Sequence, residues 1–496
     1  MINNPILLED FYKICHKNLY PDNMTKLYST WVPRSNKYFS RSNEVIWFGL
    51  QAFIKKYLIE NFNENFFNRN IEEVLEEYKL YISNTFEENP ETEHFKKLHK
   101  LGYLPIEIKA LKEGTKVPYR VPCMTIENTH EDFAWLTNFL ESIISCSLWS
   151  PSTCATLAYE YRKIIEKYVE KTGDNPNWKS VACGDFSYRG MSSNESALSA
   201  SSGFLTSFTK TSTIPVLPYL NQYYNADSAK ETVGNWSASV EHSCTTSNFA
   251  VDSDEEKFFL RMCTEIYPKG NFSFVCDSYD YFNFINIILP KYKDVVLNRE
   301  GCINVRPDSG DPEKIICGNE ESDDKLEKLG TINSLWNTFG GYINSKGYKV
   351  LDKHIRIVYG DSITLERCES ICNRLMTMGY SVENVIFGVG SYSLQYLTRD
   401  TQGWALKATY AVINGKEIEI FKNPKTDEEN IKKSLKGKVV VIEDQEGKLK
   451  AIDGLNNEDY SKYRNEDLLQ TVFENGKLFK ETSLREIREE IYNKNF

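Results

Sequence analysis

Four short apolar runs in the middle of the chain each end in a polar turn. They are FSFVCDSYD (272–280), CINVRPDSGD (302–311), IRIVYGDS (355–362) and VIFGVGSYS (385–393). Runs this short and this apolar are typical of parallel strands that are buried on both faces. Asp, Gly and Ser follow each run, and the carboxyl ends of parallel strands are where binding and catalytic groups collect. A single such turn is equally well explained by helix capping, but a succession of them predicts a shared site.

Two other stretches carry residue types that suit a flat, charged ligand. In DFSYRG (185–190) an aromatic residue stands close to an arginine and a glycine turn, which suits a flat ring with an anionic group nearby. Taken alone, Phe186 is better explained as a core residue and Arg189 as a surface ion-pair partner. His242 follows Glu241 among small hydroxyl residues and lies on no apolar stripe. It is therefore a candidate catalytic histidine, although a single histidine is more often structural.

Periodicity predicts the elements that would position these residues. Apolar residues at helical spacing predict a helix over 323–339, which would connect two of the strands. The same spacing predicts a helix within 70–86, and 106–111 is predicted to be a strand. Two long helical patterns follow between 131 and 173, and we expect them to be broken at Pro151.

After residue 400 the pattern changes to hairpins. Residues 405–413, 417–421 and 439–442 alternate or run apolar, and Asn414-Gly415 and Asn475-Gly476 have the composition of two-residue turns. These features predict a mostly antiparallel sheet. We expect this sheet to join the N-terminal segment in one discontinuous α+β domain of residues 1–150 and 400–496, with a second, α/β domain over 151–399.

Length and composition exclude several classes of protein. A chain of 496 residues suggests about three domains, or two large ones, and 41% hydrophobic with 26% charged residues is ordinary globular composition. The formal net charge of −11 argues against general binding to nucleic acid or to membrane surfaces. No secretory signal pattern is visible, and no apolar stretch approaches the ~18 residues of a membrane span. We therefore expect a soluble, cytoplasmic protein.

Cysteine and histidine spacing indicates neither a disulfide framework nor a metal site. The 12 cysteines include no C-x-x-C pair, and the six histidines include no H-E-x-x-H pattern. Free, reduced thiols are expected in a cytoplasmic chain of this size.

Several motifs have a common explanation when their order and spacing are considered. They are DFSYRG (185–190), EHS (241–243), CDSYD (276–280), RPDSGDP (306–312), the Gly360-Asp361 turn, FGVGSY (387–392) and LTRD (397–400). Together they resemble the nicotinamide phosphoribosyltransferase family. The segments YKICHKNLYP (12–21), ENTHEDFAWLTNFLES (127–142), NSKGYKVL (344–351) and DLLQTVFENGK (467–477) are also similar to that family, so the resemblance extends nearly from end to end.

The resemblance implies a homodimeric enzyme. Its reaction would join nicotinamide to phosphoribosyl pyrophosphate, giving nicotinamide mononucleotide and pyrophosphate. The implied fold is an irregular α/β barrel of the type II phosphoribosyltransferase kind with an appended sheet domain, and the active sites would lie at the dimer interface.

The resemblance also implies roles for particular residues. Phe186 and Tyr12 of the partner subunit would sandwich the pyridine ring, and Arg189 would lie at the ring and the phosphate. The remaining substrate-binding residues would hold the ribose and its 5′-phosphate. The carboxylates would accept hydrogen bonds from ribose hydroxyls, and the N–H groups of the glycine turns would donate to the phosphate. They are Arg306, Asp308, Asp361, Gly360, Gly390 and Ser391.

ATP and Mg²⁺ are implied as co-substrate and cofactor. The family's basic positions would bind pyrophosphate or ATP phosphates with Mg²⁺ bridging, and they correspond here to Arg34, Arg399, Lys407, Lys422 and Lys432. His242 matches the histidine that this family phosphorylates from ATP, which couples ATP hydrolysis to tighter binding. A carboxylate, Glu241 or Asp280, would set the tautomer of that imidazole.

Some positions depart from the family pattern. Ser212 stands where the family has an aspartate that accepts from the nicotinamide carboxamide, and the loss of this charge weakens discrimination against nicotinic acid. Ala405 replaces a polar residue. Lys438 replaces an arginine, so the paired hydrogen bonds that a guanidinium can donate are lost. The match is loose over 233–240 and at Cys183-Gly184.

Two other functions compete with this interpretation. Nicotinate phosphoribosyl transfer, or dual specificity, is favoured by Ser212 and disfavoured by the EHS motif. A non-catalytic nucleotide-binding relative should have lost Arg306, Asp308, Arg399 or His242, and all four are present.

Overall fold

The computed structural model describes residues 4–86, 90–360, 362–427, 431–493 and 496, and the chain divides into two compact units. The first unit comprises Met1–Thr156, Tyr219–Ala226 and Leu397–Phe496. The second comprises Leu157–Pro218 and Asp227–Tyr396. The inclusion of residues 219–226 in the first unit was not predicted from the sequence.

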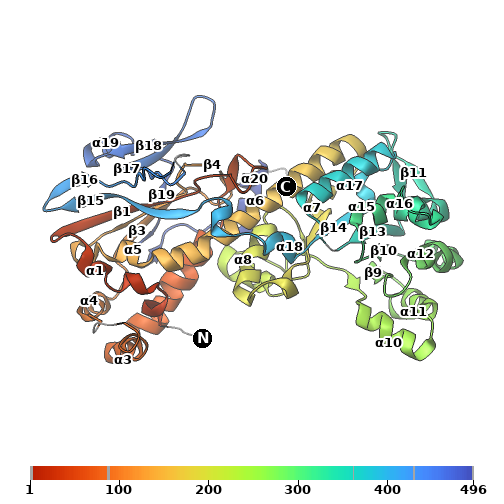
Figure 1. The fold of residues 1–496 in the computed structure, drawn as a ribbon, viewed down its shortest axis with the longest axis horizontal. Coiled ribbons are helices and arrows are strands. Elements are labelled where there is room, and N and C mark those ends of the chain that lie inside the picture. The colour runs from red at the N-terminus through yellow and green to blue at the C-terminus, as the bar shows by residue number, and fades with distance from the viewer. Residues whose placement is uncertain (1–3, 87–89, 361, 428–430, 494–495) are drawn as a thin grey trace. The chain divides into compact units, whose positions relative to one another are not determined.

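A seven-stranded antiparallel sheet forms the centre of the first unit (Figure 1). β1 (Met24–Val32) pairs with β15 (Ala405–Ile413), and this pairing confirms that the N- and C-terminal segments share one sheet. Asn414 and Gly415 both have positive φ, as the predicted two-residue turn requires. In spatial order the strands are β16 (Lys416–Glu419), β15, β1, β5 (Met124–Asn128), β3 (Ile106–Ala110), β19 (Gln470–Glu474) and β20 (Lys477–Leu478).

The helices of this region differ from the prediction at Pro151. A single helix, α6 (Glu141–Thr172), passes through this proline without a break, so the expected separation into two helices is wrong. The proline is buried, and the next residue, Ser152, both donates to the backbone oxygen of Phe48 and accepts from its N–H. Packing of the chain around this turn therefore outweighs the lost helical hydrogen bond. The predicted helix within 70–86 is present as α3 (Ile71–Ile82).

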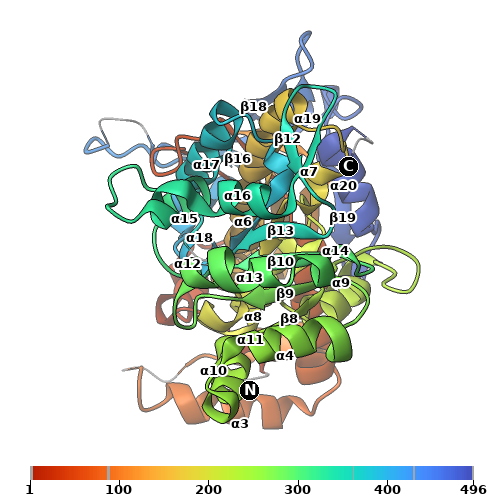
Figure 2. The same ribbon diagram turned by 90° about the vertical axis from the view of Figure 1, so that its right-hand side faces the viewer.

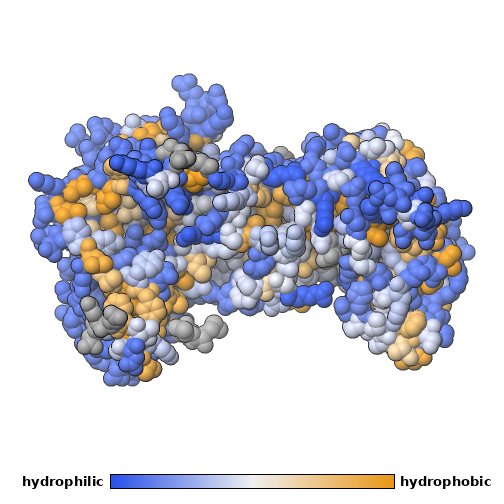
Figure 3. All heavy atoms as spheres, viewed as in Figure 1, coloured by the Kyte–Doolittle hydropathy of each residue, from blue (hydrophilic) through white to orange (hydrophobic). Residues whose placement is uncertain are grey.

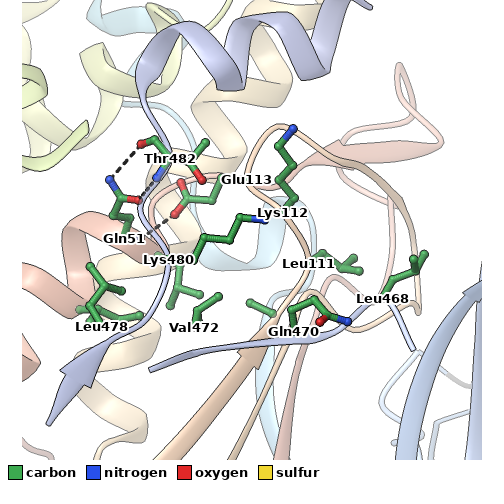
Figure 4. A pocket seen from close by; sticks show the side chains of 13 residues that line it. Gln51, Leu111, Lys112, Glu113, Leu468, Gln470, Val472, Leu478, Lys480 and Thr482 are labelled. Carbon is green, nitrogen blue, oxygen red and sulfur yellow. Dashed lines mark hydrogen bonds between the residues drawn. The ribbon is translucent and has the colours of Figure 1, made fainter. Parts of the chain in front are cut away.

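The buried carboxylate of Glu113 links residues 219–226 to the first unit. Figure 4 shows Glu113 beside Gln51 and Thr482. Glu113 accepts hydrogen bonds from the N–H groups of Gly49 (2.9 Å) and Gln51 (2.6 Å) and from the hydroxyl of Tyr224 (2.9 Å). The side-chain amide of Gln51 in turn donates to the backbone oxygens of Tyr223 and Thr482. Burial raises the pKa of Glu113, but these donors compensate the loss of hydration. The network thus joins residues from all three chain segments that make up the first unit.

The second unit is built on a seven-stranded parallel sheet (Figures 1 and 2). The four predicted strands are adjacent in this sheet, and helices such as α16 (Lys325–Phe339) and α17 (Leu365–Thr377) form the crossovers. In spatial order the strands are β7 (Lys210–Thr211), β6 (Cys183–Asp185), β14 (Val385–Val389), β13 (Ile355–Tyr359), β10 (Ile303–Arg306), β9 (Phe272–Val275) and β8 (Ala238–Ser239).

The two edges of the parallel sheet meet at Asn235. This residue lies three positions before β8 and forms a parallel bridge to Lys210 in β7, the strand at the opposite edge. Its N–H donates to the backbone oxygen of Thr209 (2.7 Å), and its own oxygen accepts from the N–H of Thr211 (3.3 Å). The sheet therefore closes on itself, and the predicted irregular α/β barrel is confirmed.

Apolar side chains are exposed near the N-terminus, although most of the visible surface is hydrophilic (Figure 3). Tyr12 is 55% exposed, and Leu19, at the end of α1 (His16–Leu19), is 71% exposed. Within the described ranges, no helix has the length and apolar character needed to cross a membrane.

Candidate active site

Phe186 lies at the carboxyl edge of the barrel against three glycines. A Cβ atom at Gly184, Gly360 or Gly388 would lie 2.9, 3.1 or 2.7 Å from a carbon of the Phe186 ring. Gly184 and Gly388 lie within β6 and β14, and Gly360 follows β13, the next strand of the sheet. All three are needed for space and not for a positive φ. The N–H of Phe186 donates to the backbone oxygen of Val389 (3.0 Å). The ring is therefore held in place by backbone from three strands.

Ser212 lies beside Phe186 because their strands pair in register. Asp185 is opposite Thr211 in the β6–β7 pairing, so the following residues of the two strands continue side by side. Ser212 donates both its N–H (2.8 Å) and its hydroxyl (3.1 Å) to the backbone oxygen of Asp185.

The carboxylate of Asp185 fixes the two turns behind these residues. It is fully buried, and one oxygen accepts from the hydroxyls of Thr211 (2.8 Å) and Thr213 (2.7 Å). The other oxygen accepts from the N–H (3.0 Å) and hydroxyl (2.6 Å) of Ser187. A buried carboxylate needs such donors, so Asp185 stabilises the geometry of both turns.

Arg306 and Asp308 form an ion pair at the end of β10. The distance between Nη2 of Arg306 and Oδ2 of Asp308 is 3.0 Å, and both side chains are mostly buried. Among the described residues, the buried Nε of Arg306 has no acceptor. This donor is therefore available to an oxygen of a ligand. Gly360 lies at the neighbouring strand end, and Asp361, predicted to bind ribose, lies outside the described residues.

His242 faces two carboxylates at this edge of the barrel. It is the first residue of α10 (His242–Asp252), and its Nε2 lies 3.8 Å from Oδ1 of Asp277 and 4.0 Å from Oδ2 of Asp308. Its Nδ1 lies 3.0 Å from the hydroxyl of Ser278. Asp277 accepts from the N–H of Asp308 (2.8 Å), so these acidic residues form one connected group.

Gly390 and Ser391 begin the short helix α18 (Ser391–Leu394). Apart from its chain neighbours, no atom lies within 4 Å of a Cβ built on Gly390, so the space beside this residue is open. The Ser391 hydroxyl packs against Gly190, next to Arg189, and the side chain of Arg189 is 87% exposed. The structure therefore places the Arg189 turn next to the predicted phosphate-binding turn.

The predicted basic residues gather in the first unit. Arg34, Lys407 and Ala405 line one cavity of about 220 Å³ together with Arg120 and Lys433. Burial lowers the pKa of Arg34, and the charge of Arg399 lowers it further. The pKa of Lys407 is likewise lowered by burial, with smaller contributions from Arg34 and Lys422. Lys422 and Lys432 are exposed. This concentration of positive charge suits a polyphosphate.

Tyr12 and Arg399 line a second cavity of the first unit, of about 480 Å³. Lys438 lines neither cavity. Its Nζ lies 3.3 Å from Glu127 and within 5.2–5.7 Å of the ring centroids of Tyr28, Tyr410 and Tyr460, so its charge is already compensated.

Comparison with known proteins identifies the family of this chain. The nicotinate phosphoribosyltransferase (NAPRTase) family model matches residues 181–477, and the model of the nicotinamide phosphoribosyltransferase N-terminal domain matches residues 4–108. A nicotinamide phosphoribosyltransferase of Acinetobacter baylyi is 40% identical over 98% of this chain and 97% of that protein. The chain belongs to the nicotinamide phosphoribosyltransferase family. A nicotinamide phosphoribosyltransferase of Mycoplasma genitalium is 33% identical over 87% of this chain and 94% of that protein.

Solved structures support the fold assignment. A nicotinate-nucleotide pyrophosphorylase from Pyrococcus furiosus has a TM-score of 0.60 at 14% identity, covering 99% of this chain and 95% of that one. Human nicotinic acid phosphoribosyltransferase has a TM-score of 0.58 at 16% identity, covering 98% and 93%. Similarity at this level of identity shows that the fold is shared.

Glu241 and Asp280, the carboxylates predicted to orient the His242 imidazole, both cap helices in this structure. Glu241 caps α10 by accepting from the N–H (2.8 Å) and hydroxyl (2.7 Å) of Ser243. Asp280 caps α12 (Tyr281–Asn283) by accepting from the N–H of Asn283 (2.9 Å). The carboxylate nearest the imidazole is that of Asp277, which the sequence analysis did not single out. The signal available in the sequence was its position two residues after β9, which is equivalent to that of Asp308 two residues after β10.

Proposed function

We propose that this protein transfers the phosphoribosyl group of phosphoribosyl pyrophosphate to nicotinamide in NAD salvage. The observation that carries the proposal is the Arg306–Asp308 pair with an orphan guanidinium Nε at the edge that also holds Phe186. Such an edge suits a substrate with a flat ring, ribose hydroxyls and phosphates. The full-length similarity to the Acinetobacter baylyi enzyme favours nicotinamide as the ring.

In this proposal the ring nitrogen of nicotinamide attacks C1 of the ribose. The bond from C1 to pyrophosphate breaks, and its electron pair leaves with the pyrophosphate. Positive charge develops on the sugar in the transition state, so the carboxylate of Asp308 stabilises it while accepting from a ribose hydroxyl. Phe186 supports the pyridine ring, and Arg306 donates from Nε to a substrate oxygen.

The residues at the carboxyl edge of the barrel suit a Mg²⁺ ion that also binds the phosphates of the substrate. The carboxylate atom Oδ1 of Asp277 is buried and has no hydrogen-bond donor among the described residues, and Asp308 lies beside it. Magnesium commonly takes one or two carboxylates and completes its shell with phosphates and water. Asp277 and Asp308 would therefore hold the ion, which would neutralise charge on the leaving pyrophosphate.

ATP coupling through His242 is part of the proposal. One ring nitrogen of His242 attacks the γ-phosphorus of ATP, the bond to the β–γ bridging oxygen breaks, and ADP leaves. Both ring nitrogens have polar neighbours: Nδ1 lies beside the Ser278 hydroxyl, and Nε2 faces the carboxylates of Asp277 and Asp308. The basic cavity that contains Arg34 and Lys407 would bind ATP or pyrophosphate phosphates.

We also propose a homodimer in which Tyr12 completes the pyridine site of the partner subunit. The exposure of Phe11, Tyr12 and Leu19 supports this assembly, because large apolar side chains gain free energy when a partner covers them. Cytoplasmic location remains a prediction from the sequence.

Nicotinic acid is a second candidate substrate because Ser212 carries no charge. The Ser212 hydroxyl donates to a backbone oxygen, so toward a ligand it can only accept. A carboxamide offers it an N–H group, whereas an ionised carboxylate offers none. We therefore propose nicotinamide as the preferred substrate and nicotinic acid as a weaker one.

Product formation by Arg306→Ala tests the assigned site. Removal of the guanidinium should lower kcat/KM for phosphoribosyl transfer by about a hundredfold or more, as expected for a lost charged contact to a developing anion. Arg261→Ala is the matched control, because Arg261 is exposed and hydrogen-bonded to Asn248 on a helix of the same unit. Equal activity of both variants would contradict the assignment.

A further inference from the structure

Trp236 is exposed to an extent that is unusual for tryptophan. The indole is 42% exposed, whereas Trp31, Trp47 and Trp404 are completely buried. It lies in the polar run NWSAS (235–239), so no apolar stripe of its own segment accounts for it. An exposed indole gives up a large burial free energy, and such residues are enriched where a ligand covers them.

The backbone around Trp236 is anchored to the carboxyl edge of the barrel. Asn235 is fixed to β7 by its two backbone hydrogen bonds with Thr209 and Thr211. In continuing register Trp236 is therefore opposite Thr211, the residue before Ser212. The indole is thus attached to the seam that closes the barrel, next to Phe186 and Ser212.

The rings of Trp236 and Phe186 form a corner. Their centroids are 4.7 Å apart, and their planes are inclined by 64°. A flat ring that stacks on one member of such a pair presents its edge to the other, and both arrangements are favourable between aromatic rings. We propose that Trp236 is a specificity-determining residue that, with Phe186, binds the pyridine ring.

The proposed chemistry explains why this position carries an indole and not an aliphatic group. It rests on the proposed function, in which bond formation at the ring nitrogen converts a neutral pyridine into a cationic pyridinium. Tryptophan is the strongest aromatic partner of a cation. Trp236 therefore contributes more to binding of the mononucleotide product than an apolar residue of similar size.

Steady-state kinetics of Trp236→Leu and Trp236→Phe test this role. Trp236→Leu should raise KM for nicotinamide by about tenfold while KM for phosphoribosyl pyrophosphate changes by less than about twofold. Trp236→Phe should remain within about threefold of the unmodified protein, because it keeps an aromatic face. The matched control is Tyr267→Leu, since Tyr267 is 41% exposed but precedes β9 at the opposite edge of the barrel.

Fluorescence distinguishes failure of this inference from failure of the proposed function. Nicotinamide and nicotinamide mononucleotide should change the tryptophan emission of the unmodified protein, and Trp236→Phe should lose this change. Loss of the fluorescence change in Trp236→Phe would support the inference even if the protein transferred nothing to nicotinamide. The absence of transfer would then contradict the proposed function alone. Unchanged KM in Trp236→Leu together with an unchanged signal in Trp236→Phe would overturn the inference.

Discussion

The hydroxyl of Ser212 donates a hydrogen bond of 3.1 Å to the backbone oxygen of Asp185. Because a carbonyl oxygen can only accept, this contact leaves the serine oxygen as an acceptor toward any ligand. Selection of a carboxamide can thus be achieved without the aspartate that the family places at this position. Ser212 lacks the negative charge of that aspartate, however, and the loss of this charge weakens discrimination against nicotinic acid.

Ser212→Asp should therefore increase discrimination against nicotinic acid. A carboxylate at this position would still accept from a carboxamide, and it would repel the carboxylate of nicotinic acid by several kcal/mol in a partly buried site. The measurement is the ratio of kcat/KM values for the two pyridines in the unmodified protein and in the variant. An unchanged ratio would show that residue 212 does not face the exocyclic group.

His242→Ala should abolish stimulation by ATP while slow basal transfer persists. The imidazole is the proposed phosphoryl acceptor, whereas Arg306 and Asp308 hold the sugar. Transfer is measured with and without ATP, and ATP hydrolysis is followed in parallel. His354→Ala is the control, because His354 also pairs with an aspartate, Asp352 (2.6 Å), but lies before β13. Full ATP coupling in His242→Ala would contradict the assignment.

Glu255→Gln should reduce the loss of stability at high pH. Burial and the nearby carboxylates of Asp280, Asp254 and Asp277 raise the pKa of Glu255 to about 7. Between its unfolded pKa, near 4.5, and about pH 7 the folded state binds more protons, so stability falls as pH rises through this window. Solvent screening limits the contribution of Glu255 titration to the free energy of unfolding to the order of 1 kcal/mol.

The corresponding measurement compares urea midpoints at pH 5 and pH 8. Glu255→Gln should resemble the unmodified protein at pH 5 and be more stable at pH 8. Glu265→Gln is the control, since Glu265 is exposed on the helical segment that begins at Glu255. A pH dependence identical to that of the unmodified protein would show that Glu255 titrates normally.

Tyr12→Ala should weaken pyridine binding by about 1 kcal/mol or more through lost stacking. Tyr81→Ala provides a matched control, because Tyr81 is exposed to almost the same extent, 53% against 55%. KM for nicotinamide is measured together with the oligomeric state by light scattering. A monodisperse monomer with full activity at assay concentration would contradict the shared site.

The sequence predicted the parallel strands of the barrel because burial on both faces leaves a continuous apolar run. It could not predict that α6 continues through Pro151, because that outcome depends on contacts with Phe48, about a hundred residues away. The same limit applies to the site. The position of Asp277 beside His242, and that of Trp236 beside Phe186, depend on strand order and on closure at Asn235.

The most direct test of the proposed function is to incubate the purified protein with phosphoribosyl pyrophosphate, Mg²⁺ and each pyridine in turn, and to identify the products by mass spectrometry. We predict nicotinamide mononucleotide and pyrophosphate in equal amounts, with a higher kcat/KM for nicotinamide than for nicotinic acid. Product formation with nicotinic acid but not with nicotinamide, or with neither pyridine, would contradict the proposed function.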